Sequence, residues 1–243
     1  MNNIIDINNK IKNPDNNPGK LVVISGPSGC GKGTVIKELF NLNEYKYSVS
    51  ATTRSPRIGE TEGLDYYFLT KEEFFKKISD GDMLEYAEYL GNYYGTLREP
   101  VEKMLRKQYN VILEIEVVGA LNIKEKFPEA IMIFLTPPTF SELERRLRER
   151  GTETEEGINK RLEKAKNEIE NICKYDYLVI NDFNMQKRAA FNINCILEAV
   201  KSEYLRQSEH KDMPNEIKSI YKTAEENMIN KEKTEKFLKN YFS

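Results

Sequence analysis

Short apolar runs alternate with longer amphipathic stretches along most of the chain. Four runs rich in Val, Ile and Leu are typical of buried strands: 21–24, 111–116, 131–135 and 177–180. The stretches between them carry apolar residues at helical spacing and predict helices over 32–42, 97–108, 140–150, a segment beginning after Thr152, and 184–206. Strands that alternate with helices predict an α/β fold with a parallel sheet flanked by helices.

The pattern changes between about residues 51 and 94, after a short predicted strand at 47–50. Residues 51–64 are polar and are interrupted by Pro56, Gly59 and Gly63, which predicts a loop. Short strands at 66–69, 84–89 and 92–95 and a helix at 71–79 follow. Such short strands do not fit a parallel sheet, so we expect a small inserted α+β subdomain here.

The two ends of the chain differ from the globular part, which we place at 20–206. Residues 1–19 are rich in Asn and predict a flexible leader without a function of its own. Residues 207–243 are rich in Lys and Glu, with apolar residues at helical spacing. This extension fits a helical tail packed on the core, a dimer contact or a mostly disordered segment.

Composition narrows the function classes. The 243 residues carry a net charge of −2, so no basic field favours nucleic acid, and no apolar run approaches the length of a membrane span. One histidine excludes histidine metal clusters and Ser–His–Asp triads, and the three cysteines lack metal-ligand spacing. The N-terminus has no apolar signal core and no arginine before Arg54, so we expect a cytoplasmic protein.

A glycine-rich loop follows the first predicted strand and precedes the first predicted helix. It contains the phosphate-binding pattern G-x-x-x-x-G-K, with these residues: Gly26, Pro27, Ser28, Gly29, Cys30, Gly31, Lys32, Gly33 and Thr34. Backbone N–H groups and the helix N-terminus can cradle phosphates there, while Lys32 adds a positive charge. The alternative is a tight turn without a ligand. The usual hydroxyl after the lysine arrives one place late, at Thr34, which weakens the case for its direct ligation of Mg²⁺.

A second candidate anion site lies in the polar loop. Arg54 and Arg57 flank Pro56, and two guanidinium groups suit a phosphate dianion. A solvated basic loop is the alternative. The neighbouring tyrosines of the predicted subdomain, Tyr66 and Tyr94 among them, favour a nucleotide site.

Together these motifs resemble guanylate kinases from about residue 20 to 205. The resemblance rests on the phosphate loop and on further motifs in the same order: Thr52-Thr53-Arg54 through Glu60, Gly63-x-Asp65-Tyr66, Gly91 through Thr96, Leu113-Glu114-Ile115-Glu116, and Arg150-Gly151-Thr152-Glu153. It implies a P-loop NTPase-type sheet, a GMP-binding insertion at about 51–94 and a helical lid at about 137–168.

The resemblance also implies residue roles. Ser50, Arg54, Arg57, Tyr66 and Tyr94 would hold the GMP phosphate. Glu85, with Ser50 and Thr96 nearby, would read the guanine edge, and Gly95 belongs to the same site. Glu116 would hold Mg²⁺ through water or contact the guanine side; it is a longer acid than the family usually has, and Val118 replaces a common glutamine.

On the ATP side, the resemblance implies that arginines of the lid close on the phosphates. Arg146 and Arg150 share a helix face, and Arg161 lies on the next helix. Asn181 matches a position that contacts adenine, with Asp182 beside it. Catalysis would depend on Lys32, Arg57, Arg150 and Arg161.

The activity implied is phosphoryl transfer from ATP, with Mg²⁺, to GMP and also dGMP, in a monomer or homodimer. No protein ligand set for a resident metal is expected. A non-catalytic module of this fold that binds a phosphorylated protein is the main alternative, and a kinase for another nucleoside monophosphate is the second.

Overall fold

The computed structural model describes residues 19–42, 45–89, 91–149, 154–201 and 215–242. Almost all of the expected leader, and Arg150 through Glu153, lie outside the described residues. The chain divides into two compact units. Among the described residues, one unit contains those of 19–26 and 45–132, and the other contains those of 27–42 and 133–242.

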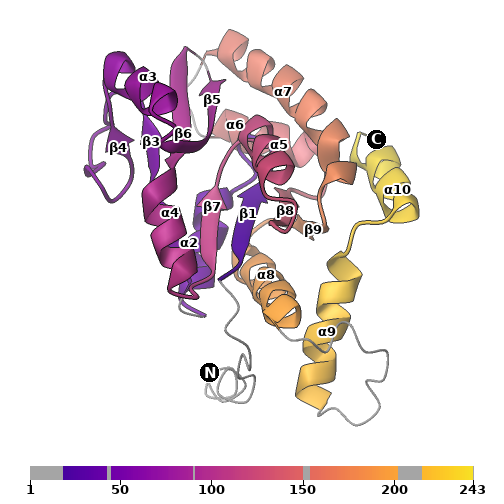
Figure 1. Cartoon of the computed structure of the whole chain (residues 1–243). Coiled ribbons are helices and arrows are strands. Elements are labelled where there is room, and N and C mark those ends of the chain that lie inside the picture. Colours follow the sequence, from indigo (N-terminus) through magenta and orange to yellow (C-terminus); the bar gives the residue numbers. More distant parts are fainter. Residues whose placement is uncertain (1–18, 43–44, 90, 150–153, 202–214, 243) are drawn as a thin grey trace. The chain divides into compact units, whose positions relative to one another are not determined.

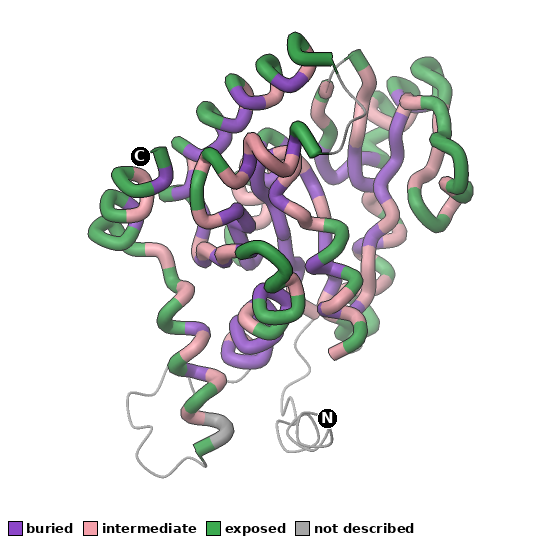
Figure 2. Tube along the Cα trace, turned by 180° about the vertical axis from the view of Figure 1, so that it is seen from behind, coloured by how far each residue is buried: buried purple, intermediate pink, exposed green. Residues whose placement is uncertain are grey.

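The large sheet is parallel, as the sequence predicts. Its strands follow the order β2-β7-β1-β8-β9, with these bounds: β1 Leu21–Ser25, β2 Lys46–Tyr47, β7 Val111–Glu114, β8 Ile131–Thr136 and β9 Tyr177–Ile180. β7 pairs with β1 and with β2, and β8 pairs with β9, each in parallel register. All five residues of β1 are buried, and Figure 2 shows buried positions in purple along the inner segments of the tube.

Helices α4 Arg98–Arg106 and α5 Val117–Lys126, of the unit of residues 45–132, lie beside β7 and β1 respectively. The sequence reasoning assigned no helix to residues 117–126. α5 begins with Val117, Val118 and Gly119, which are poor helix formers. Burial of Val117, Ala120 and Ile123 supplies the stabilisation that intrinsic propensity lacks.

The same unit contains a second sheet in the order β4-β3-β6-β5 (Figure 1). Its strands are β3 Ser50–Thr52, β4 Tyr67–Phe68, β5 Met83–Tyr89 and β6 Asn92–Leu97. The predicted strand at 47–50 is therefore wrong: β2 ends at Tyr47 and β3 begins at Ser50. Helix α3, Lys71–Ser79, has the predicted bounds, because Thr70 and Glu73 form a capping box at its start.

The other unit is built mainly from helices beside β8 and β9. They are α2 Lys32–Phe40, α6 Phe140–Glu149, α7 Glu155–Ile169, the 3₁₀ helix η1 Glu170–Lys174, α8 Gln186–Lys201, α9 Asn215–Asn227 and α10 Lys231–Tyr241. α6 and α7 share an apolar cluster that includes Leu143, Leu147 and Leu162. The N-cap of α7 is Thr154, whose hydroxyl accepts from Gly157 N–H, so the helix begins at Glu155 and not directly after Thr152 as the sequence predicts.

The C-terminal helices pack within their own unit. Tyr221 and Ala224 of α9 and Tyr241 of α10 are buried. Between the two helices, Ile229 N–H donates to the Asp176 carbonyl at 2.9 Å. Figure 1 draws α9 and α10 in yellow at the end of the chain. The described part of the extension is therefore an ordered helical tail.

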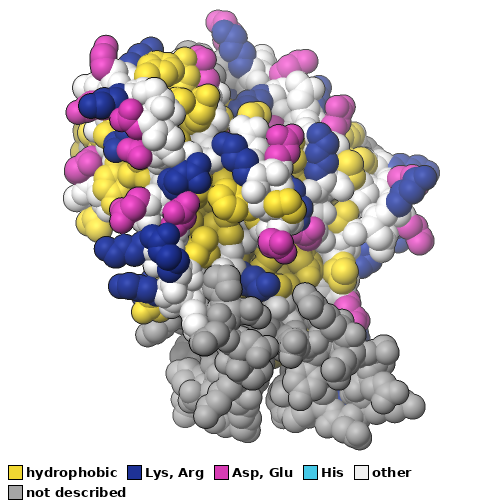
Figure 3. All heavy atoms as spheres, viewed as in Figure 1, with side chains coloured by type: hydrophobic (Ala, Val, Ile, Leu, Met, Phe, Trp, Pro, Cys, Tyr) yellow, Lys and Arg dark blue, Asp and Glu magenta, His cyan; other side chains and the backbone are white. Residues whose placement is uncertain are grey.

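Charges on the surface are mixed in sign. On the face shown in Figure 3, lysine and arginine side chains are interspersed with aspartates and glutamates. Among the described residues, no helix has the length and apolar character needed to cross a membrane.

Candidate functional site

The phosphate loop joins β1 to α2, and its glycines permit a tight path. Gly31, the N-cap of α2, has φ 90° in the left-handed region. A β-carbon at Gly31 would lie 2.5 Å from Asn181 Nδ2, and one at Gly29 would lie 2.8 Å from Leu147 Cδ2. The backbone there therefore packs directly against Asn181, which follows β9, and against Leu147 of α6, as only glycine allows.

Lys32 is folded back onto the loop. Its ammonium donates to the Pro27 carbonyl at 3.4 Å and lies 4.0 Å from Cys30 Sγ. The Thr34 hydroxyl donates to the Gly31 carbonyl at 2.8 Å. Cys30 is fully buried, whereas Gly33 and Thr34 are exposed in the first turn of α2.

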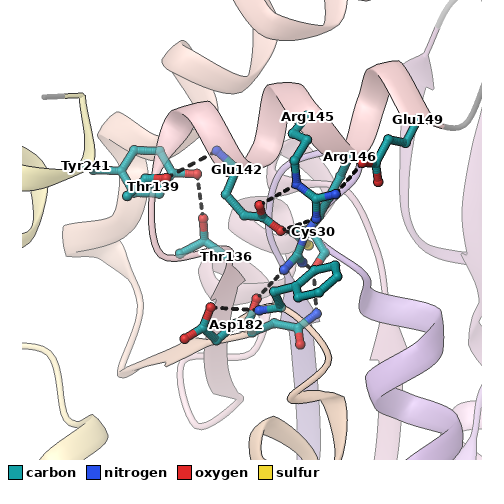
Figure 4. A network of polar contacts seen from close by, with 11 residues as sticks. Cys30, Thr136, Thr139, Glu142, Arg145, Arg146, Glu149, Asp182 and Tyr241 are labelled. Atoms are coloured by element: carbon teal, nitrogen blue, oxygen red, sulfur yellow. Dashed lines mark hydrogen bonds and ion pairs between the residues drawn. The ribbon is translucent and has the colours of Figure 1, made fainter.

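Arg146 of α6 hydrogen-bonds to the phosphate loop (Figure 4). Its guanidinium donates to the Cys30 carbonyl at 3.3 Å and to the Asn181 carbonyl at 2.9 Å. Asn181 Nδ2 also donates to the Cys30 carbonyl, at 2.8 Å. Glu142, one turn earlier on α6, receives Arg146 Nε at 2.7 Å. Hydrogen bonds from Arg145 and Arg146 lower the pKa of the Glu142 carboxyl to about 2, so Glu142 stays ionised.

A second arginine reaches the loop from α7. Arg161 Nη1 donates to the Ser28 hydroxyl at 2.8 Å. The structure thus brings together Ser28, Cys30 and Asn181 with two of the three predicted lid arginines, and Arg150 lies outside the described residues. Asp182 is exposed and accepts from the Phe183 N–H at 2.7 Å. The Phe183 ring lies 4.7 Å from the Arg145 guanidinium carbon.

The polar loop that carries Arg54 and Arg57, called the arginine loop below, belongs to the unit of residues 45–132. Glu60 holds this loop in its conformation. Its carboxylate receives Arg54 Nη2 at 2.8 Å and the Arg57 backbone N–H at 2.7 Å. The Arg54 guanidinium also lies over the Tyr66 ring, 5.4 Å from its centroid. The Arg57 side chain is exposed. Glu60 therefore holds Arg54 in place and leaves the Arg57 charge open to an anion.

Aromatic residues adjoin this loop. Tyr66 and Tyr94 pack edge to face with their ring centroids 6.1 Å apart. Tyr47 Oη donates to Glu114 Oε2 at 3.4 Å. Burial, and then the Glu114 charge, raise the pKa values of Tyr47 and Tyr66, so both phenols stay protonated. Tyr47 donates its hydrogen to Glu114, whereas the Tyr66 phenol can donate to a ligand.

Glu85 is the buried acid of the second sheet. It is 3% exposed, and the Thr96 hydroxyl donates to Glu85 Oε1 at 2.8 Å. Thr96 also lies opposite Ser50 in the β3–β6 register, so these three predicted residues are neighbours. Burial raises the pKa of the Glu85 carboxyl to about 7, against smaller lowering effects of Thr96 and Lys126.

Two glycines leave room around Glu85. A β-carbon at Gly119 of α5 would lie 2.3 Å from Glu85 Oε2, and one at Gly95 of β6 would lie 2.8 Å from the Glu85 carbonyl. Glu116 is half-buried and is the N-cap of α5, because β7 already ends at Glu114. The predicted strand over 111–116 was thus two residues too long.

Comparisons with known proteins agree with the resemblance to guanylate kinases that the sequence motifs indicate. The family model described as guanylate kinase matches residues 18–199. The chain belongs to the guanylate kinase family. The guanylate kinase of Streptococcus pneumoniae (strain ATCC BAA-255 / R6) is 53% identical over 183 residues, which cover 74% of this chain and 87% of that protein.

Another relative and a solved structure cover similar shares. The guanylate kinase of Clostridium perfringens (strain SM101 / Type A) is 50% identical over 196 residues, 80% of this chain and 90% of that protein. A crystal structure of guanylate kinase from Anaplasma phagocytophilum matches with a TM-score of 0.63 and 33% identity, covering 79% of this chain and 90% of that one. Helices α9 and α10 lie beyond the residues that the family model matches.

Sequence reasoning missed several residues that organise the two sites. Glu60 and Glu142 hold predicted arginines, Tyr47 and Glu114 adjoin Tyr66, and Gly119 makes space for Glu85. The i, i+4 spacing of Glu142 and Arg146 is a signal that was readable from the sequence. The contact of Gly119 with Glu85 joins residues far apart in the chain, and no local pattern reports it.

Proposed function

We propose that this member of the guanylate kinase family transfers the γ-phosphoryl group of ATP to GMP, and to dGMP, giving ADP and the diphosphate. The observation that carries the proposal is Glu85, a buried carboxyl beside Thr96 in the sheet next to the arginine loop. Guanine presents N–H donors at N1 and N2, and a carboxylate accepts from both. Adenine presents an acceptor at N1, which would leave the buried Glu85 unpaired, and such a mismatch can cost about 10⁴-fold in specificity.

The GMP phosphate would be held by the arginine loop. Arg57, whose side chain is open, and Arg54, held by Glu60, supply two guanidinium forks. Ser50 and the phenols of Tyr66 and Tyr94 add hydrogen-bond donors. The acceptor is already an anion, so the reaction needs no strong general base.

The ATP phosphates would occupy the loop from Gly26 to Thr34, with Asn181 and Asp182 toward the adenine. Lys32 and Arg161, together with Arg150, would neutralise charge that develops on the transferred group, while Arg57 holds the accepting phosphate in line. Arg146 would fix the loop through the Cys30 carbonyl. Closure of the lid over 137–168 would exclude water and prevent ATP hydrolysis.

Mg²⁺ fits the oxygen ligands available. Thr34 offers a hydroxyl in the first turn of α2, and Glu116 offers a carboxylate after β7. Among the described residues no three His, Cys, Asp or Glu side chains cluster into a metal site. We infer that phosphate oxygens and water would supply most of the ligands of the ion. When bound, Mg²⁺ would neutralise phosphate charge. We place the reaction in the cytoplasm, since Cys30, Cys173 and Cys195 are not joined by disulfides, as is usual in a reducing compartment.

A coupled assay of ADP release tests the proposal. The purified chain is given ATP with GMP, dGMP, AMP, UMP or dTMP, each with and without Mg²⁺. We expect rapid ADP release with GMP, slower release with dGMP and only background release with the others. Nucleotide binding without GMP-dependent ADP release would favour the non-catalytic module, and a different preferred monophosphate would assign the chain to another kinase.

A further inference from the structure

The C-terminal helix α10 ends on a side chain that reaches the sheet. Tyr241 is 1% exposed although it belongs to the last helix of the chain. Its hydroxyl lies 2.9 Å from the Thr136 hydroxyl at the end of β8, and either group can donate. Thr136 is itself fully buried, so water does not replace this bond at low cost. Figure 4 shows the Tyr241 and Thr136 side chains next to each other near the start of α6.

The Tyr241 ring also contacts the first residue of α6. Its centroid lies 6.3 Å from that of Phe140, and the Phe242 ring centroid lies 5.4 Å from that of Phe140. Phe237, one turn earlier on α10, packs on Tyr241 at 4.9 Å. One side chain therefore joins the end of β8 and the beginning of α6.

These two attachment points are directly connected to the phosphate loop. The Thr136 carbonyl accepts from Asn181 N–H at 2.8 Å, and Asn181 Nδ2 donates to the Cys30 carbonyl. α6, which begins at Phe140, carries Arg146 to the same Cys30 carbonyl. Both routes from Tyr241 end on Cys30.

We propose that Tyr241 is a positioning residue for the ATP side of the enzyme, which fixes the start of α6 and the end of β8 and thereby holds Arg146 and Asn181 against the phosphate loop. The inference rests on the proposed function. It gives the C-terminal helices a part in substrate binding, although the family model ends at residue 199.

Loss of the Tyr241 contact should change the KM for ATP but not the KM for GMP. Tyr241, Thr136, Phe140, Arg146 and Asn181 belong to one compact unit, whereas Glu85 and the arginine loop belong to the other. Losing one buried hydrogen bond is worth about a three- to tenfold change in an equilibrium. Tyr241→Phe, which keeps the ring, should therefore raise the KM for ATP about three- to tenfold and leave the KM for GMP within about twofold.

The experiment compares full-length Tyr241→Phe, Thr136→Val and the double variant by steady-state kinetics with each substrate varied. If the hydroxyl pair acts as a unit, the double variant should show no larger KM for ATP than either single variant. Tyr221→Leu is the matched control, because it removes a buried tyrosine from α9 and should lower the melting temperature without changing the KM for ATP. Tyr241→Ala should raise the KM for ATP further, since it also removes the ring from Phe140.

An unchanged KM for ATP in Tyr241→Phe and Thr136→Val would overturn the inference. So would equal increases in KM for both substrates, because they would indicate general loosening of the fold. If Tyr241→Ala does not fold, the two conservative variants still decide. Failure of the proposed function is distinguishable, because then the unaltered chain would release no ADP with GMP.

Discussion

Burial raises the pKa of the Glu85 carboxyl to about 7, well above the 4.5 of a free glutamate. The guanine edge requires the ionised form, because only a carboxylate accepts from both N1 and N2. At neutral pH Glu85, which we propose to read the guanine edge, is therefore partly protonated. GMP binding should favour the carboxylate and release a proton.

We accordingly expect the kcat/KM for GMP to fall as the pH drops below about 7. The KM for ATP should change little over the same range. Steady-state profiles from pH 5.5 to 8.5 measure this, with Glu85→Gln as the control that cannot titrate. If the Glu85→Gln variant keeps the same pH profile, another group is responsible.

Between about pH 4.5 and 7, Glu85 should be more protonated in the folded state than in the unfolded state, so folding takes up a proton there. Because the folded pKa is the higher one, the stability contribution of the protonated carboxyl is full below the unfolded pKa and is lost as the pH rises through about 7. Glu85→Gln should therefore gain stability relative to the unaltered protein on raising the pH from 5 to 8. Urea unfolding at both pH values measures the difference.

Gly119 determines how much space the Glu85 carboxylate has. The added methyl group of Gly119→Ala would lie 2.3 Å from Oε2 and force the carboxylate away. We expect the kcat/KM for GMP to fall at least about tenfold with the KM for ATP unchanged. In a Glu85→Ala background the same substitution should have no further effect, and an equal loss in that background would assign it to α5 packing instead.

At the scale of elements, most of the fold could be predicted because the pattern and the local chemistry agree. α3 has its predicted bounds because Thr70 and Glu73 cap it, and β9 coincides with an apolar run. α5 could not be predicted, since tertiary burial overrides the poor propensities of its first turn. The candidate site divides in the same way: motif residues such as Lys32 could be predicted, but the distant partner of Glu85, Gly119, could not.

Arg161 allows a test of the predicted lid at this scale. Arg161→Ala removes the guanidinium that reaches Ser28, so turnover should fall at least about 100-fold while the KM for GMP changes little. Arg148→Ala is the matched control, because Arg148 on α6 is paired with Glu144 and Glu155. Equal losses in the two variants would indicate damage to the helices and not loss of a catalytic charge.

At the scale of the whole molecule, the residues that we propose for the two substrates fall into two compact units. Residues proposed for ATP lie mainly in the unit of 27–44 and 133–243, and those proposed for GMP lie in the unit of 45–132. In-line transfer requires the two phosphates to meet, so catalysis requires a closed arrangement with both nucleotides bound.

We therefore expect that a substitution in one unit can change the affinity for one nucleotide without changing the affinity for the other. Lys32→Ala should weaken ATP binding at least about tenfold and leave GMP binding unchanged. Isothermal titration with each nucleotide alone measures both affinities. A parallel loss of GMP affinity would show that the two sites are not independent.

The close approach of Gly31 to Asn181 also limits which substitutions the phosphate loop can accept. Every other amino acid at position 31 would meet the Asn181 amide and a strained φ, so a library selected for growth should retain glycine there. Position 33, exposed in the first turn of α2, should tolerate serine or alanine. Gly31 and Gly33 are separated by one residue but differ in how far they can be substituted. The Asn181 amide and the positive φ exclude a side chain at position 31, whereas position 33 can accept one.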